Sequence, residues 1–153
     1  CGDILGEMAL LTNKPRSASA VAATSVALIK ITKDIFEEMI KYHPVLLHST
    51  WTTFGRHALD NFITSNKLFP YMKENKRREW MEQSHFEECE ESRPQILPAN
   101  IEWIFIITGT VTVNGTEHTG PSLSSLDRSS SVTAVDAARI LWLPSFSSYE
   151  CAL

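Results

Sequence analysis

Two side chains near the start of the chain have the chemistry to hold a ligand that carries both a sugar hydroxyl and a phosphate. Glu7 and Arg16 stand nine positions apart (16 − 7), on either side of a short turn. A carboxylate accepts from a hydroxyl, and the planar guanidinium of an arginine matches phosphate oxygens. Gly6 lets the backbone approach a ligand closely, and Ser17 and Ala18 are small enough for their N–H groups to reach the same anion. The pattern predicts a sugar-phosphate site.

The segments that follow must position this site. Residues 19–31 are small and β-branched with partial alternation, which predicts two short strands that meet at a turn near Thr24-Ser25. Thr32 is predicted to cap a helix that has acidic residues in its first turn. Pro44 is predicted to start a second helix, whose apolar residues recur at helical spacing and form one face: Leu47, Trp51, Phe54, Ala58 and Phe62.

The stretch from Gly2 to Ala18 resembles the phosphate-binding cassette of cyclic-nucleotide-binding domains, whose usual pattern is Phe-Gly-Glu-aliphatic-Ala-Leu, a variable turn, and Pro-Arg-x-Ala. The chain matches this pattern at Gly6, Glu7, Met8, Ala9, Leu10, Leu11, Pro15, Arg16 and Ala18, and departs from it at Leu5, where Phe is usual. The resemblance implies that Glu7 accepts from the ribose 2′-hydroxyl and that Arg16 pairs with the cyclic phosphate. The expected ligand-binding residues are Gly6, Glu7, Met8, Ala9, Arg16, Ser17 and Ala18. A plain surface salt bridge between Glu7 and Arg16 is the alternative.

The second half of the chain resembles the same β-roll family more loosely. Residues 101–107 predict a strand, Gly109 a bend, residues 110–113 a second strand, and Asn114-Gly115 a hairpin turn. Further on, the apolar run that begins at Ile140 starts twelve residues after Arg128 (140 − 128), as the run at Leu28 starts twelve residues after Arg16 (28 − 16). We interpret residues 123–143 as a decayed copy of the cassette and its strands. This copy lacks the Gly-Glu pair, and chance similarity in a Ser-rich stretch is the alternative.

These patterns predict an α+β fold, a jelly-roll-like β-roll with flanking helices, in which a partial first roll precedes a degenerate second roll. The expected domains are residues 1–66, the C-terminal half of a cyclic-nucleotide-binding domain with its following helices; 67–84, a helical linker; and 85–153, the degenerate second roll. The linker carries a cluster of alternating basic and acidic residues, 73–79, which is expected to be the wet face of a helix, with contact to anionic lipid as the alternative. Because the chain opens at Cys1 directly on the cassette, it is expected to be a fragment of a longer protein.

Composition narrows the function classes. The 153 residues carry a formal net charge of −4, which argues against nucleic-acid binding. The three cysteines lie far apart and fit neither a disulfide framework nor a zinc spacing. The longest apolar run, near residues 101–113, is shorter than the roughly 20 residues that span a bilayer. No catalytic motif is found, His85 with Cys89 is a weak metal signal, and neither enzymatic activity nor a cofactor other than the nucleotide ligand is expected.

The residues after the strands, including Ile31-Thr32-Lys33-Asp34, the segment from Tyr42 to Leu47 and Trp51, resemble the regulatory tail of sodium/proton exchangers of the sperm type. The resemblance implies a cAMP or cGMP sensor at the cytoplasmic face of a membrane, with the transport domain of its own parent as partner and homodimerisation through that parent. The regulatory domain of a cyclic-nucleotide-gated channel, a kinase regulatory subunit and a ligand-free interaction module of the same fold are the alternatives. Ser17, a hydroxyl after the arginine, is a slight indication of cGMP.

Overall fold

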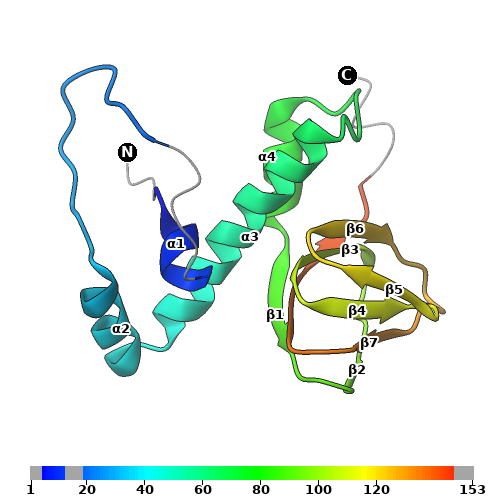
Figure 1. Ribbon diagram of the computed structural model, residues 1–153. Coiled ribbons are helices and arrows are strands. Elements are labelled where there is room, and N and C mark those ends of the chain that lie inside the picture. The colour runs from blue at the N-terminus through cyan, green and yellow to red at the C-terminus, as the bar shows by residue number, and fades with distance from the viewer. Residues whose placement is uncertain (1–4, 13–18, 147–153) are drawn as a thin grey trace. The chain divides into compact units, whose positions relative to one another are not determined.

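The computed structural model describes residues 5–12 and 19–146 of the chain (Figure 1). The chain divides into two compact units, Cys1–Phe54 and Gly55–Leu153. The boundary falls inside a long helix, so the first part of that helix belongs to the first unit and the rest to the second. The two units are described separately.

The described part of the first unit contains helices and one irregular segment, residues 19–32. It contains α1 (Glu7–Thr12), α2 (Lys33–Tyr42) and the first half of α3 (Val45–Ser65). The predicted cap is confirmed, because the Thr32 hydroxyl accepts from the Ile35 backbone N–H at 3.5 Å. Phe36 is the buried residue of α2, and α3 begins directly after Pro44, as the sequence predicts.

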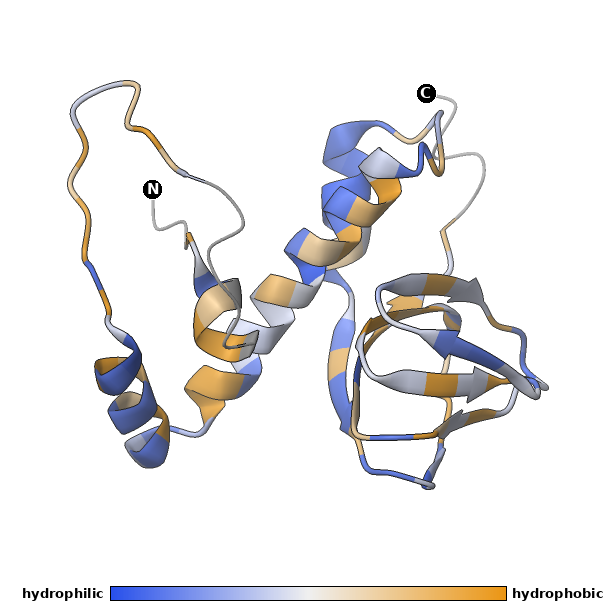
Figure 2. Ribbon diagram, viewed as in Figure 1, coloured by the Kyte–Doolittle hydropathy of each residue, from blue (hydrophilic) through white to orange (hydrophobic). Residues whose placement is uncertain are grey.

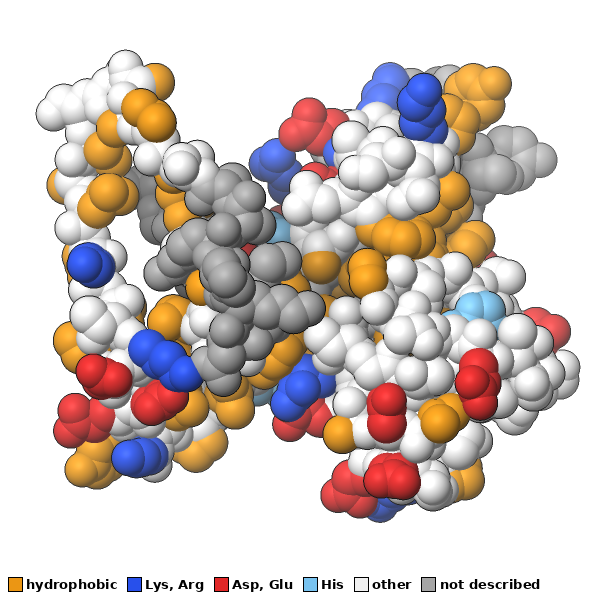
Figure 3. Space-filling model, viewed as in Figure 1, with side chains coloured by type: hydrophobic (Ala, Val, Ile, Leu, Met, Phe, Trp, Pro, Cys, Tyr) orange, Lys and Arg blue, Asp and Glu red, His pale blue; other side chains and the backbone are white. Residues whose placement is uncertain are grey.

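The two strands that the sequence predicts within residues 19–31 are not formed, and this prediction is wrong. The segment is irregular, every residue of it is exposed, and Val21 and Ile29 keep 90% and 92% of their side-chain surface accessible. Figure 2 shows the hydrophobic residues of this segment in orange, and hydrophobic side chains are visible on the surface in the space-filling view of Figure 3. The physical reason is that a strand is stable only when its backbone groups pair with a neighbour. Neither sheet of the described structure includes this segment.

The second unit contains a sandwich of two four-stranded antiparallel sheets. The first sheet has the order β1 (His85–Cys89), β8 (Ala138–Pro144), β3 (Ile101–Thr108) and β6 (Ser122–Ser125). The second sheet has the order β2 (Pro94–Gln95), β7 (Val132–Ala134), β4 (Thr110–Val113) and β5 (Thr116–Thr119). The expected α+β fold class with antiparallel strands is confirmed.

The predicted hairpin is also confirmed. Asn114 and Gly115 join β4 to β5 and have φ angles of 50° and 81°, which is the left-handed geometry that two-residue hairpin turns require. At the bend between β3 and β4, Gly109 has a φ of 84°, and a Cβ there would lie 2.7 Å from the Cα of Ala138. Glycine is therefore required at this bend both by its backbone angle and by the space around it.

The core of the second unit lies between the two sheets. Residues that alternate along β3 and β8 point into it, and its buried members include Ile104, Ile106, Val111, Val132, Ile140 and Trp142. The central strands β3 and β8 are buried on both faces over residues 104–107 and 140–143. They read as continuous apolar runs for this reason, because a strand with both faces covered has no polar side.

Helical segments cover the outer face of the first sheet. The part of α3 that belongs to this unit packs Phe62 against Phe105, with ring centroids 5.6 Å apart. Gly55 lies so close to β3 that a Cβ would come within 2.5 Å of the Ile107 side chain. The helix α4 (Glu74–Glu82) buries Trp80 and Met81, as predicted, and the Trp80 indole N–H donates to the Pro144 carbonyl at 2.7 Å.

The buried thiol of Cys89 yields a first prediction. Burial, and secondarily the charge of Glu87, raises the pKa of Cys89 to about 12. Because the thiolate is the nucleophile, we expect iodoacetamide at pH 8 to label this cysteine about a hundredfold or more slowly in the native protein than in urea. Mass spectrometry of the labelled peptide, with Cys89→Ala to assign the signal, measures the rate. Rapid labelling of the native protein would contradict the burial of this side chain.

Candidate functional site

The predicted anchor for a ribose lies at the start of α1. Gly6 has a φ of 80°, in the left-handed region that favours glycine, and it directly precedes the first residue of the helix, Glu7. Glu7 is only 8% exposed. A carboxylate at this position lies in the first helical turn, where the helix dipole stabilises a negative charge. The local sequence Gly-Glu therefore produces a turn followed by a buried acid.

The other predicted site residues divide into two groups. Met8 and Ala9 follow Glu7 within α1, and Ala9 is half-buried. Leu5, which stands where the family has Phe, is 74% exposed. Arg16, Ser17 and Ala18 lie outside the described residues, so their proximity to Glu7 stays a prediction. The structure brings Gly6, Glu7, Met8 and Ala9 together in one turn and a short helix.

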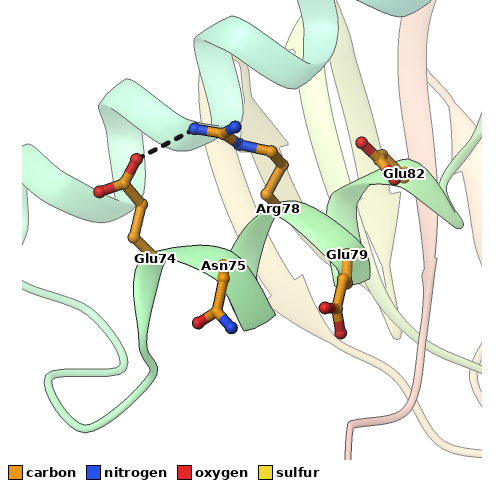
Figure 4. A pocket seen from close by; sticks show the side chains of 5 residues that line it. All are labelled: Glu74, Asn75, Arg78, Glu79 and Glu82. Atoms are coloured by element: carbon orange, nitrogen blue, oxygen red, sulfur yellow. Dashed lines mark hydrogen bonds and ion pairs between the residues drawn. The ribbon is translucent and has the colours of Figure 1, made fainter.

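Two of the open hollows on the described surface are lined by residues of the second unit. The first, of about 450 Å³, lies along the exposed side of α4 and is lined by Glu74, Asn75, Arg78, Glu79 and Glu82 (Figure 4). The second, of about 260 Å³, lies near β1 and β2 and is lined by Glu87, Glu88, Glu90, Arg93, Pro94, Gln95 and Ile96. Both are surface depressions rich in charged groups.

The basic cluster of residues 73–79 is neutralised by neighbouring carboxylates. Arg78 pairs with Glu74 at 3.1 Å, as the dashed line in Figure 4 marks, and Lys76 pairs with Glu79 at 2.9 Å. Arg77 reaches across to Asp60 of α3 at 2.5 Å. These pairs favour the interpretation of the cluster as the solvated side of α4 and leave little net positive charge for an anionic lipid.

The residues that we interpret as a decayed copy of the cassette lie in the second unit. Its residues form β6, a loop of residues 126–131, β7 and β8. Ser122 and Leu123, where an acid would be expected, belong to β6, and Arg128 is exposed in the loop. What the sequence reasoning missed is a network centred on Asp127 and Ser130; an Asp followed two residues later by Ser is a typical turn signal and could have indicated it.

Metal binding and membrane insertion have no structural support in the described part of the chain. Among residues 5–12 and 19–146, no group of three His, Cys, Asp or Glu side chains is placed to hold a metal ion. His85 and Cys89 lie on a strand, β1, at its two ends. Over the same residues, no helix has both the length and the hydropathy of a membrane span.

Comparison with known families adds one finding on the first unit. Residues 1–43 match the model of the cyclic nucleotide-binding domain family. The family resemblance of the cassette is thereby confirmed for these residues, which include Gly6, Glu7 and Arg16.

Several solved structures resemble the chain distantly. The cAMP-bound PfPKA-R (141–441) is 17% identical, with a TM-score of 0.42 and coverage of 93% of this chain and 52% of that one. DNR from Pseudomonas aeruginosa is 11% identical, with a TM-score of 0.40 and coverage of 56% and 46%. CprK C200S is 18% identical, with a TM-score of 0.33 and coverage of 46% and 43%. The chain spans about half the length of each of these structures.

Proposed function

We propose that the first unit is part of a regulatory sensor that binds cAMP or cGMP. The observation that carries the proposal is the buried carboxylate of Glu7, which directly follows the left-handed Gly6. Both residues lie in the segment that matches the cyclic nucleotide-binding domain family. Glu7 accepts from the ribose 2′-hydroxyl, and Arg16 pairs with the cyclic phosphate. Gly6, Met8, Ala9, Ser17 and Ala18 line the same ligand.

Binding acts on function by shifting a conformational equilibrium. The nucleotide must bind one arrangement of the following helices, α2 and α3, more tightly than another. The parent that receives this signal is proposed to be a membrane cation transporter of the sodium/proton exchanger type, with the chain at the cytoplasmic face. The support for this parent is the resemblance of the segments around α2 and α3 to exchanger tails.

A ligand-free packing module of the same fold is the second candidate. The observation that favours it is the second roll, whose copy of the cassette has lost its Gly-Glu pair while its sandwich keeps a buried core. This fold therefore persists in the chain without the residues of a nucleotide site. The intact Gly6-Glu7 pair and Arg16 favour the sensor for the first unit.

Calorimetric titration of the full-length protein with cAMP and with cGMP separates the two candidates. A sensor binds one of them with micromolar affinity. Glu7→Gln replaces a charged acceptor with a neutral group of the same size, and the loss of about 1.5–3 kcal/mol corresponds to about 10- to 100-fold weaker binding. The matched control is Glu38→Gln, an exposed substitution on α2 that leaves the affinity unchanged. If the folded wild-type protein bound neither nucleotide, the sensor would be excluded and the packing module would be the remaining candidate.

A further inference from the structure

The loop of residues 126–131 joins β6 to β7 and occupies the position of the cassette in the second copy. The arginine spacing that defines the copy places Arg128 in this loop, as it places Arg16 in the first cassette. An intact cassette leaves backbone N–H groups and an arginine directed at an external anion. The donors of Ser129, Ser130 and Ser131 in this loop are instead directed at groups of the chain itself.

Three donors of the loop converge on one carboxylate oxygen of the chain itself. Oδ1 of Asp127 accepts from the Ser129 backbone N–H at 2.8 Å, from the Ser129 hydroxyl at 2.7 Å and from the Ser130 hydroxyl at 3.1 Å. These are a backbone amide and two hydroxyls, the same kinds of donor that bind phosphate oxygens at turns. The same hydrogen bonds, those from Ser129 first, hold the pKa of Asp127 below its ordinary value, so the carboxylate is charged at neutral pH.

Ser130 and Ser131 of the loop also form hydrogen bonds with Asn114 of the β4–β5 hairpin. The Asn114 side chain donates to the Ser130 hydroxyl at 3.2 Å and accepts from the Ser131 backbone N–H at 2.9 Å. Ser130 is 9% exposed and its hydroxyl also accepts from the Asp127 backbone N–H at 2.9 Å. The amides of Asp127, Ser129 and Ser131 are thus satisfied within the chain.

We propose that the loop of residues 126–131 is an anion-binding turn whose anion is the chain's own Asp127 carboxylate, so that the second roll takes up no nucleotide phosphate. The carboxylate occupies the donors that a phosphate needs, and its charge repels a second anion. Ser122 and Leu123 stand where the cassette has its ribose-binding acid, so Arg128 lacks the counterpart of Glu7. The second roll is therefore folded without ligand, and nucleotide dependence resides in the first cassette alone.

The test is thermal unfolding of the full-length protein in inorganic phosphate against sodium chloride at equal ionic strength. The wild type is expected to melt at the same temperature in both salts. Asp127→Ala frees the three donors, so its second roll is expected to melt several degrees lower in chloride and to recover part of that loss in phosphate. Recovery by phosphate of the variant alone supports the proposal.

Each other outcome overturns it. If phosphate raises the melting temperature of the wild type as much as that of the variant, the wild-type loop is still open to anions. A variant that is destabilised but indifferent to phosphate, or not destabilised at all, has a turn with no anion-binding capacity. Should Asp127→Ala fail to fold, Asp127→Asn keeps the accepting oxygen without its charge, and a rise in melting temperature with phosphate above that of the wild type is expected; its absence overturns the proposal.

A second measurement, the stoichiometry of cyclic nucleotide binding, rests on the proposed function of the first unit. The full-length protein is expected to bind one nucleotide per chain, and two per chain would overturn the inference. A protein that binds none contradicts the proposed sensor, whereas the phosphate experiment still decides the state of the loop. The two failures are thus distinguishable.

Discussion

Replacing Arg16 with alanine is expected to weaken binding of cAMP or cGMP by the full-length protein about 30-fold or more. In the proposed site, the guanidinium of Arg16 supplies the positive charge and paired N–H donors for the cyclic phosphate. Removing one partner of a close, desolvated charge pair costs at least about 2 kcal/mol, and each 1.4 kcal/mol is a factor of ten in affinity. Calorimetric titration of wild type and variant measures the ratio.

The chain supplies a matched control for this prediction. Arg128 is the arginine that we interpret as the counterpart of Arg16, and it is exposed in a loop in which Ser129 and Ser130 already bind Asp127. Arg128→Ala is expected to leave nucleotide affinity and stoichiometry unchanged. Equal losses in the two variants would mean that the first cassette is not the nucleotide site, and an Arg16→Ala protein with wild-type affinity would remove the phosphate role of that residue.

Substituting Gly109 is expected to destabilise the second unit more than any other change discussed. An alanine here must adopt a φ of 84°, which costs about 1–3 kcal/mol. Its Cβ would also lie 2.7 Å from both the Ala138 Cα and the Asp136 Oδ1. Relieving that crowding costs about 1–3 kcal/mol more, because the backbone of one strand must move. Urea unfolding of Gly109→Ala, followed by tryptophan fluorescence, is expected to report a loss of about 2–6 kcal/mol.

Gly115 separates the two causes. It has nearly the same backbone angle, with a φ of 81°, but a Cβ there would meet open space within 4 Å. Gly115→Ala therefore carries only the conformational cost of about 1–3 kcal/mol. If the two variants were equally destabilised, crowding at the β3–β4 bend would contribute nothing and the close approach of Ala138 would be wrong.

Features encoded by neighbouring residues were predictable from the sequence. Thr32 caps α2 through a residue three positions away, and Asn114-Gly115 forms a turn within four residues. The Gly6-Glu7 pair likewise belongs to a local pattern, and its match to a known cassette is confirmed for residues 1–43. Short-range interactions determine these features, so the local pattern is sufficient.

Features that depend on distant partners were not predictable. The network of Asp127 draws on Asn114 of the β4–β5 hairpin, which the pairing of β4 with β7 brings beside Ser131. The strand β1 reads only as an acidic segment in the sequence, yet it pairs with β8, which is distant in the sequence, through a register that places His85 opposite Trp142 and Cys89 opposite Ala138. Neither pairing has a signal in the residues that immediately surround it.

The contrast between residues 28–31 and 140–143 separates the two kinds of information most clearly. Both are short, mainly apolar runs that begin twelve residues after an arginine. The sequence by itself determined that each is suited to a strand. It also determined that the first run follows a cassette with an acid and a base. Only the tertiary structure decided that residues 140–143 become a buried strand between β1 and β3, whereas residues 28–31 stay exposed. The reason is that the hydrogen bonds of a strand are made with its neighbours, so its stability depends on a partner that its own residues do not specify.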